Sequence, residues 1–227
     1  MPTAIVTGAS RGLGFALSDA LAERGWRLVI DGRDGAALEH AAARLRDRTE
    51  VVALPGDVTD PWHRHALVDA AGQLALLVNN ASTLGPSPLP PLSGYPLDQL
   101  EQVYRVNALA PLALAQLALP RLAEGARIVN VTSDAAVEAY EGWGGYGSSK
   151  AALEQLTAVL AAENPALRIY AVDPGDMNTR MHQEAFPGED ISDRPPPAVS
   201  VPGLLALIEG DLPSGRYSAR ALAEAPA

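Results

Sequence analysis

Short aliphatic runs alternate with longer amphipathic stretches along all 227 residues, and this rhythm limits the folds open to the chain. Runs of strand length that are rich in Ala, Ile, Leu and Val suit strands buried on both faces of a parallel sheet. They occupy residues 4–6, 28–30, 51–54, 74–78, 128–131 and 167–172. Amphipathic stretches predict helices over roughly 12–24, 34–47, 60–73, 97–119, 146–163 and 202–209. The alternation therefore predicts β-α-β units in a doubly wound α/β sheet.

Local signals for helix ends and loops agree with this pattern. The Asp60-Pro61 pair predicts a helix start, because Asp caps free N–H groups and proline suits the first helical position. Gly25 and Gly125 stand where we expect helices to end before strands. Proline-rich stretches at 83–96 and 186–202 predict loops, since proline removes a backbone donor and fixes φ. Both follow strand ends, where α/β proteins place their ligand sites.

Composition excludes several classes of protein. With 48% hydrophobic residues the chain is long enough for one full core, so we expect a single domain over residues 1–227. The formal net charge is −10 and Lys150 is the only lysine, so clustered cations for nucleic acid are lacking. The absence of cysteine excludes disulfides and thiolate metal sites. With no apolar run of spanning length and no signal-like N-terminus, we expect a cytoplasmic protein that binds neither membrane nor metal.

A glycine-rich turn follows the first expected strand and opens the first expected helix. It reads Thr7-Gly8-Ala9-Ser10-Arg11-Gly12-Leu13-Gly14. Glycines let the backbone turn tightly and approach a pyrophosphate, while the helix N-terminus offers free N–H groups and the positive end of its dipole. The turn predicts a dinucleotide site, although glycine-rich turns without a ligand are also common between strands and helices.

The Gly-x-x-x-Gly-x-Gly spacing resembles the short-chain dehydrogenase/reductase family, and further motifs of that family follow in order. They are Asp57-Val58, Asn79-Asn80-Ala81, Asn107, Ser133, Tyr146-Gly147-Ser148-Ser149-Lys150 and Pro174-Gly175. The resemblance spans roughly residues 3–181, with a last helix expected at 204–208 and a last strand at 215–218. It implies a single-domain Rossmann-type doubly wound sheet of about seven parallel strands, flanked by helices on both faces. It also implies an NAD(P)-dependent oxidoreductase.

This resemblance assigns cofactor contacts to the turn and to the later strand ends. The residues are Gly8, Ser10, Arg11, Gly12, Leu13, Gly14, Arg33, Asp57, Val58, Asn80, Ala81, Tyr146, Lys150, Pro174, Gly175, Met177 and Thr179. Relatives selective for NAD carry an acidic side chain eighteen residues beyond the last glycine, and that position is Gly32 here. Arg33 and Arg11 would attract a 2′-phosphate, so NADP is the expected cofactor. NAD stays possible, because a one-residue error in strand register would make Asp31 the ribose ligand.

The same resemblance implies the catalytic residues Ser133, Tyr146, Lys150 and Asn107. A phenol has a pKa of about 10 in water, too high for a base at neutral pH. Tyr146 and Lys150 stand four residues apart on one expected helix, so the ammonium is expected to stabilise the phenolate and to hold the nicotinamide ribose. By resemblance Tyr146 is the general acid and base, and Ser133 hydrogen-bonds the substrate oxygen. Asn107 interrupts its helix to hold a water leading to Lys150.

The substrate pocket is expected between three loops, 84–86, 135–143 and 177–186, with residues 176–200 covering it. Its expected lining is apolar and partly aromatic, from Val137, Tyr140, Trp143, Met181 and Phe186, with Glu138, Glu141 and His182 as polar exceptions. For His182 a solvated loop position is favoured over substrate contact. Without a basic cluster, a small or medium ketone, aldehyde or secondary alcohol is the expected substrate.

The preferred function is an NADP(H)-dependent carbonyl reductase that also oxidises alcohols. The alternative from another class is a non-catalytic NAD(P)-binding regulatory protein. An epimerase fits less well, because such chains carry a larger C-terminal substrate region. Ser82 departs from the family, which usually has glycine there, and brings a side chain beneath the nicotinamide ribose. The family commonly pairs the helices at 97–119 and 146–163 across subunits, which implies a homodimer or homotetramer.

Overall fold

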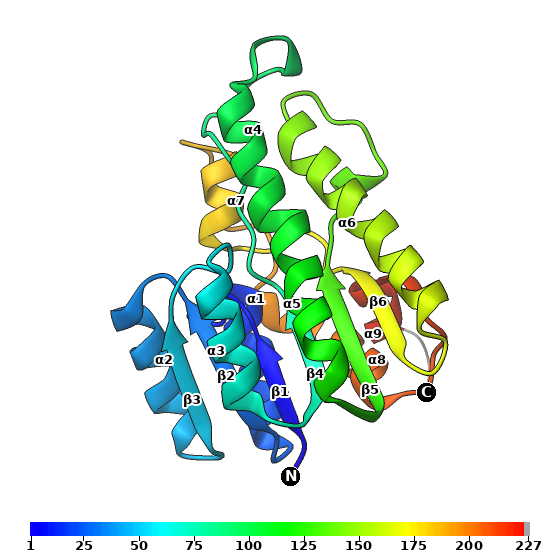
Figure 1. Ribbon diagram of the computed structural model, residues 1–227. Coiled ribbons are helices and arrows are strands. Elements are labelled where there is room, and N and C mark those ends of the chain that lie inside the picture. The colour runs from blue at the N-terminus through cyan, green and yellow to red at the C-terminus, as the bar shows by residue number, and fades with distance from the viewer. Residues whose placement is uncertain (225–227) are drawn as a thin grey trace.

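Seven parallel strands form the central sheet, in the order β3-β2-β1-β4-β5-β6-β7 (Figure 1). The computed structural model describes residues 1–224. The strands are β1 (Thr3–Val6), β2 (Arg27–Gly32), β3 (Val51–Pro55), β4 (Leu74–Asn79), β5 (Leu122–Val131), β6 (Arg168–Asp173) and β7 (Gly215–Ser218). Strand order reverses between β1 and β4, which opens a crevice at their carboxyl ends. The sheet confirms the predicted Rossmann-type fold.

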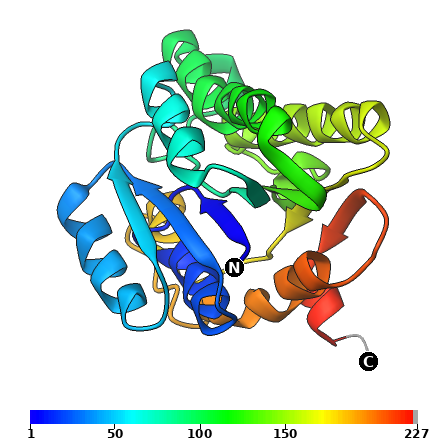
Figure 2. The same cartoon turned by 60° about the horizontal axis from the view of Figure 1, so that its bottom comes forward.

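Helices cover both faces of the sheet (Figure 2). One face carries α1 (Gly12–Glu23), α2 (Gly35–Arg46), α8 (Val201–Glu209) and α9 (Ala219–Glu224), and the other carries α3 (Pro61–Ala71), α5 (Ala110–Ala118) and α6 (Gly144–Glu163). The helix α4 (Leu97–Tyr104) lies beyond the carboxyl ends of the strands. Neighbouring strand residues point to opposite faces, so Val6 packs in one core and Ile5 in the other. Both cores are apolar, which explains the unbroken aliphatic runs. Among residues 1–224, no helix combines the length and apolar character needed to cross a bilayer.

The helix-end signals hold in two places and fail in a third. Asp60 caps α3 by accepting a hydrogen bond from the Trp62 N–H at 2.9 Å. Gly25 follows α1 with a φ of 73°, a left-handed conformation that favours glycine. The prediction for Gly125 is wrong, because the preceding helical segment ends before β5 and Gly125 lies inside that strand. There the pairing register with β4 shifts, and the glycine adopts a φ of 72°.

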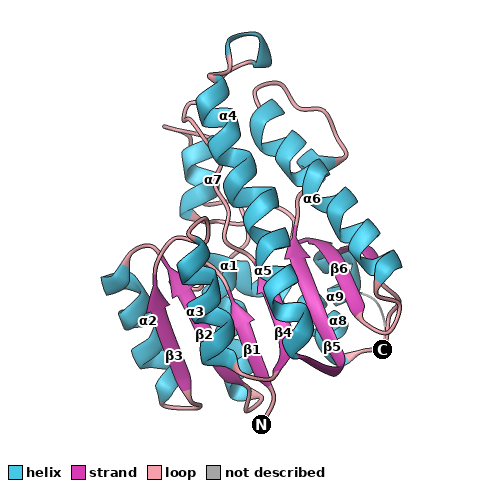
Figure 3. Ribbon diagram, in the orientation of Figure 1, coloured by secondary structure: helices cyan, strands magenta, loops and turns pink. Residues whose placement is uncertain are grey.

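The proline-rich stretches contain more helix than the sequence predicted. A 3₁₀ turn forms at Pro197–Ser200 and leads directly into α8, which begins at Val201, one residue before the predicted start of that helix. The short helix α7 (Arg180–Ala185) was not predicted, since six residues are too few to show a helical period. The hydroxyl of Thr179 starts it by accepting a hydrogen bond from the His182 N–H at 3.2 Å. Figure 3 shows α7 among loops beyond the carboxyl ends of the strands.

Candidate active site

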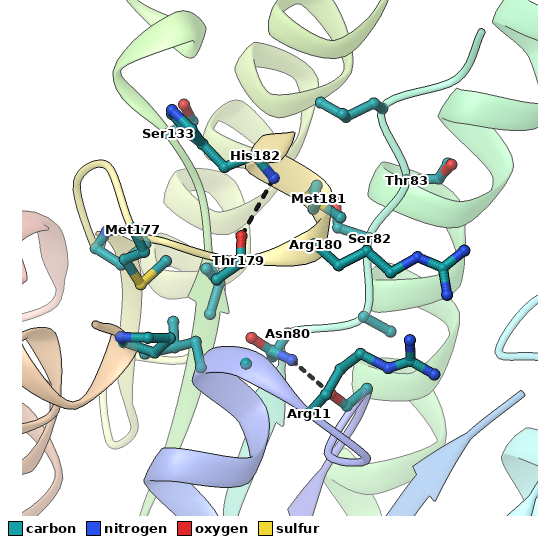
Figure 4. A pocket seen from close by; sticks show the side chains of 18 of the residues that line it. Arg11, Asn80, Ser82, Thr83, Ser133, Met177, Thr179, Arg180, Met181 and His182 are labelled. Atoms are coloured by element: carbon teal, nitrogen blue, oxygen red, sulfur yellow. Dashed lines mark hydrogen bonds between the residues drawn. The ribbon is translucent and has the colours of Figure 1, made fainter. Parts of the chain in front are cut away.

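A cavity of about 1500 Å³ opens at the carboxyl ends of the strands. This volume exceeds the roughly 300–1,000 Å³ of a site for one drug-sized ligand, so a cofactor and a substrate both fit. All the residues predicted to bind cofactor or to act in catalysis line the cavity, except Gly14 and Asn107. Figure 4 shows Arg11 and Asn80 at one end and Ser133 and His182 at the other. The fold therefore brings the two predicted halves of the site together.

The glycine-rich turn is packed so closely at Gly8 and Gly14 that neither position has room for a side chain. A Cβ at Gly14 would lie 2.5 Å from the carbonyl oxygen of Gly8, and one at Gly8 would lie 2.9 Å from the Cα of Ala81. Gly14 therefore sits behind the cavity wall and lets α1 approach the turn. The amide of Asn80 donates to the carbonyl oxygen of Thr7 at 2.8 Å and ties the turn to the end of β4. Such a rigid backbone cradle at a helix N-terminus fits a dinucleotide pyrophosphate.

Asp31 supports this turn from inside. Its side chain is 1% exposed; Oδ1 accepts a hydrogen bond from the Gly8 N–H at 2.6 Å, and Oδ2 lies 3.1 Å from Nε2 of the buried His63. Both oxygens are therefore engaged within the protein, which argues against the alternative in which Asp31 binds the ribose. The contribution of His63 was not foreseen, because it follows Asp31 by thirty-two residues and meets it only through packing of α3 on β2.

Arg11 and Arg33, the two arginines predicted to attract a 2′-phosphate, both line the cavity. Arg11 forms an exposed ion pair with Asp34 at 3.4 Å. Arg33 lies close enough to Asp57 for its positive charge to stabilise the Asp57 carboxylate. Burial raises the pKa of the Asp57 carboxyl, but hydrogen bonds from Thr59 and the charge of Arg33 outweigh burial and leave that pKa below its ordinary value.

Tyr146 and Lys150 lie one turn apart on α6, and both are buried. The Lys150 Nζ donates to the carbonyl oxygen of Val131 at 2.7 Å and lies 5.6 Å from the centre of the Tyr146 ring. Burial lowers the pKa of Lys150 to about 7, while the carboxylate of Glu154 opposes this. Burial also raises the pKa of Tyr146, although the hydroxyls of Ser82 and Ser133 act to lower it. The expected lowering of the Tyr146 pKa is therefore not seen, because desolvation of the phenolate dominates.

Ser133 follows β5 directly and caps a short 3₁₀ turn. Its Oγ donates to Oδ1 of Asp134 at 2.8 Å and accepts from the Ala135 N–H at 3.2 Å. The hydroxyl of Tyr140 lies 3.1 Å from the other oxygen of Asp134 and 2.8 Å from Oε2 of Glu138, and its single hydrogen can be donated to either carboxylate. Sequence reasoning missed Asp134, whose place beside Ser133 was visible but whose side-chain direction was not.

Asn107 lies in a π-helical turn, Arg105–Leu109, that separates α4 from α5, so it interrupts its helix as the resemblance implied. Its side chain is fully buried and fully used. Oδ1 accepts from the Thr83 N–H at 2.9 Å and from the Ser82 hydroxyl at 3.0 Å. Nδ2 donates to the Thr83 carbonyl at 2.8 Å and to the Ser149 hydroxyl at 3.0 Å. The side chain therefore fixes the loop after β4 against α6 rather than facing the cavity.

The predicted apolar and aromatic lining is only partly found in the cavity. Tyr140, Trp143, Met181 and Phe186 line the cavity. Val137, which is 61% exposed, does not line it, and neither do the exposed Glu138 and Glu141. The solvated interpretation of His182 is wrong: its side chain is only 11% exposed, lines the cavity and packs on Phe186 with ring centres 5.0 Å apart. Helix α7 places it there. Within residues 1–224, no group of three or more His, Asp or Glu side chains is arranged to hold a metal ion.

Comparison with known proteins gives the same family. A family model described as short chain dehydrogenase matches residues 2–190. The chain is 37% identical over 195 residues to 1-deoxy-11-beta-hydroxypentalenate dehydrogenase of Streptomyces avermitilis, covering 79% of this chain and 70% of that protein. It is 33% identical over 193 residues to an (S)-benzoin-forming benzil reductase of Saccharomyces cerevisiae, covering 79% of this chain and 73% of that protein.

Solved structures agree with the sequence comparisons. A short chain dehydrogenase from Pseudomonas syringae superposes with a TM-score of 0.90 at 29% identity, covering 96% of this chain and 94% of that one. A short chain dehydrogenase from Shigella flexneri complexed with NADP gives a TM-score of 0.87 at 27% identity, covering 96% and 97%. The chain therefore belongs to the short chain dehydrogenase family. Members of this family are NAD(P)-dependent oxidoreductases, and this protein is an enzyme of that class.

Proposed function

We propose that this enzyme is an NADP(H)-dependent carbonyl reductase in which Tyr146 is the general acid and base. The observation that carries the proposal is the grouping of Tyr146, Ser133 and Lys150 at one end of a cavity whose other end carries the glycine cradle. A redox cofactor and a proton donor are both needed to reduce a carbonyl group. The cavity is large enough to hold the cofactor, and Tyr146 is the proposed proton donor.

The protonation states of Tyr146 and Lys150 suit reduction. Because burial raises the pKa of Tyr146, the phenol keeps its proton at neutral pH and can give it from Oη to a carbonyl oxygen. Ser133 Oγ, on turning from Asp134, donates a hydrogen bond to the same oxygen. NADPH, when bound, supplies the hydride. Lys150, with a pKa of about 7, is poised to return a proton to Tyr146, and a water held beside the Asn107 turn is the proposed route.

NADP is the proposed cofactor because positive charge gathers where the adenosine ribose would lie. Arg11 and Arg33 line that end of the cavity, and Gly32 puts no carboxylate there. The Asp31 oxygens are taken up by Gly8 and His63. The solved relative complexed with NADP supports the same choice.

The proposed substrate is a small or medium ketone or aldehyde with an aromatic or bulky apolar substituent. Trp143 lies edge-on to Tyr146, with ring centres 5.8 Å apart, and 6.0 Å from the ring centre of Phe186. These rings would contact an apolar group next to the reacting carbonyl. A relative that reduces benzil, an aromatic carbonyl compound, supports this class.

A homodimer or homotetramer is proposed through α4, α5 and α6. Large apolar side chains are exposed on or beside these helices: Leu97 is 77% exposed, Leu109 54% and Val159 44%. Isolated exposed apolar residues are common, but this group lies on the helices that the family pairs. Light scattering at micromolar concentration should show more than one subunit, whereas a monomer alone would contradict the proposal. The cytoplasmic location stays a prediction.

The test of the proposed function is NADPH oxidation. Purified protein is mixed with NADPH and a panel of aryl ketones, aldehydes, quinones and pterins, and absorbance at the reduced-nicotinamide band is followed. We expect consumption with at least one carbonyl compound. Fluorescence titration of NADPH and NADH in parallel should give tighter binding of NADPH. Tight NADPH binding with no consumption on any member would instead favour the non-catalytic regulatory alternative.

A further inference from the structure

Val131, Thr132 and Ser133, at and just after the end of β5, are each held by the side chain of a basic or acidic residue. Lys150 Nζ donates to the carbonyl oxygen of Val131 at 2.7 Å. Glu154 Oε1 accepts from the hydroxyl of Thr132 at 2.7 Å. Arg216 donates to the carbonyl oxygen of Ser133 at 3.3 Å. The third of these backbone residues carries the proposed catalytic hydroxyl, so its position depends on the three charged side chains.

Two of these three side chains, Glu154 and Arg216, are also bonded to each other. Arg216, from β7, donates through Nε to Oε1 of Glu154 at 2.9 Å, and its other end lies 3.5 Å from Oδ2 of Asp173. The Glu154 side chain is 15% exposed, so its charge is poorly screened by water. One turn before it on the same helix stands Lys150. Glu154 therefore lies between a buried cation that it favours and a partly exposed cation that offsets its charge.

We propose that Glu154 and Arg216 form a positioning pair that holds Ser133 in place and sets the charge carried by Lys150. The effect of this pair on turnover rests on the proposed function. Its effect on the charge of Lys150 does not, because that charge can be measured without a substrate. Neither residue lines the cavity, so neither contacts substrate or cofactor. Glu154 acts through Thr132 and through its field at Lys150. Arg216 acts through the Ser133 carbonyl and through Glu154.

The titratable and charged groups of this region come from several elements. On α6, Tyr146 and Glu154 stand one turn before and one turn after Lys150. Asp173 ends β6, Asp134 follows Ser133, and both act on Tyr146, while Arg216 of β7 pairs with Glu154 and Asp173. Of these, Glu154 is the group that acts on Lys150 most directly, by favouring its charged form. Because the pKa of Lys150 is about 7, a small change in that field alters its charge at neutral pH.

We expect the two single variants to shift the pKa of Lys150 in opposite directions, which general disruption of the site would not do. Removing the Glu154 charge should lower the pKa of Lys150, since the ammonium loses a favourable neighbour. Removing the Arg216 charge should raise it, since the ammonium then loses a neighbouring cation that opposes the field of Glu154. Because the two fields add, changing both together should give a midpoint between those of the two single variants. A general loosening of the site would move both single variants in one direction.

The experiment uses the fact that Lys150 is the only lysine of the chain. Protein grown with lysine labelled with ¹³C at Cε gives one side-chain resonance, whose shift is followed against pH without any substrate. The variants are Glu154→Gln, Arg216→Gln and the double change. Glu163→Gln is the matched control, because Glu163 is an exposed acid on the same helix. We expect Glu154→Gln to lower the titration midpoint by about one pH unit and Arg216→Gln to raise it by about half a unit, with the control unchanged.

A second readout links the pair to turnover. The pH profile of kcat/KM for NADPH-dependent carbonyl reduction should move in the same direction as each Lys150 midpoint. Midpoints within about 0.2 pH units of wild type, or shifts of the same sign, would overturn the inference. If the midpoints move as expected but no carbonyl compound is reduced, the proposed function fails while the control of Lys150 stands. Arg216 is at an accessible edge strand, so its variant remains informative should Glu154→Gln fold poorly.

Discussion

The two ends of the cavity differ in how fully their polar groups are used. At the cofactor end, the Gly8 N–H, both oxygens of Asp31 and the Asn80 amide all have partners within the protein. At the substrate end, Nε2 of His182 is buried without one. No other cavity-lining residue in the part of the chain that the structure describes has such an atom.

This difference indicates that the cofactor end has a fixed geometry, whereas the substrate end can adjust to what it binds. A satisfied network holds one geometry, which suits a cofactor that must always dock in the same way. An unpartnered buried nitrogen costs roughly 1–3 kcal/mol, and a ligand group or a small movement of α7 would remove that cost. Changes at the cofactor end should therefore affect nucleotide affinity and stability, whereas changes at the substrate end should affect turnover.

The largest effect should come from Tyr146→Phe. Loss of the proton donor should reduce kcat by about 10²- to 10⁴-fold, while the Kd for NADPH changes by less than about threefold. Steady-state kinetics and fluorescence titration measure the two quantities. Tyr95→Phe is the control, since its buried hydroxyl has no partner and does not line the cavity. Near-normal turnover by Tyr146→Phe on a carbonyl that the wild type reduces would disprove the assignment.

At the cofactor end, Gly14→Ala should produce the opposite profile. The new Cβ would meet the Gly8 carbonyl, and overpacking of about 1–3 kcal/mol that displaces the turn should weaken NADPH binding by roughly tenfold to a hundredfold. Gly94→Ala, where a Cβ meets open space, should bind NADPH like the wild type. Equal affinities for the two variants would show that the turn is not the rigid cradle described above.

Asp31→Asn tests whether the buried carboxylate is a support or a ribose ligand. Weakening its charge-assisted bond to Gly8 should lower the free energy of unfolding by about 1.5–3 kcal/mol, measured in urea. The ratio of the Kd values for NADH and NADPH should not change, because both carboxylate oxygens already have partners within the protein. The exposed Asp34→Asn should alter stability by no more than about 0.5 kcal/mol. A changed cofactor ratio in Asp31→Asn would restore the ribose-ligand alternative.

Lys150→Met should remove a pH dependence of stability, a change in free energy of the same size as that expected for Asp31→Asn. The wild-type pKa falls from its ordinary value near 10.5 to about 7 on folding, so the unfolded state binds more protons between these values and stability rises with pH. From pH 7 to pH 9 the wild type should gain about 2 kcal/mol that the variant does not. Urea unfolding without cofactor at both pH values measures this. Parallel changes in the two proteins would mean that Lys150 titrates normally.

Most of the fold and much of the site could be predicted because they depend on local pattern. The aliphatic runs of β1 to β6 and the glycine-rich turn are contiguous in sequence, so their role is visible without tertiary information. Contacts between distant segments could not be foreseen. His63 meets Asp31 only after α3 packs on the sheet, and Arg216 reaches Glu154 only after β7 joins β6.

The sequence by itself determined a doubly wound sheet, a dinucleotide turn and a tyrosine one helical turn from the only lysine, because spacing along a helix or strand fixes which side chains share a face. Only the tertiary structure decided the protonation of those side chains. Burial raised the pKa of Tyr146 and lowered that of Lys150, and burial depends on all the segments packed around a group. The same holds for His182, which a six-residue helix turns from solvent into the cavity.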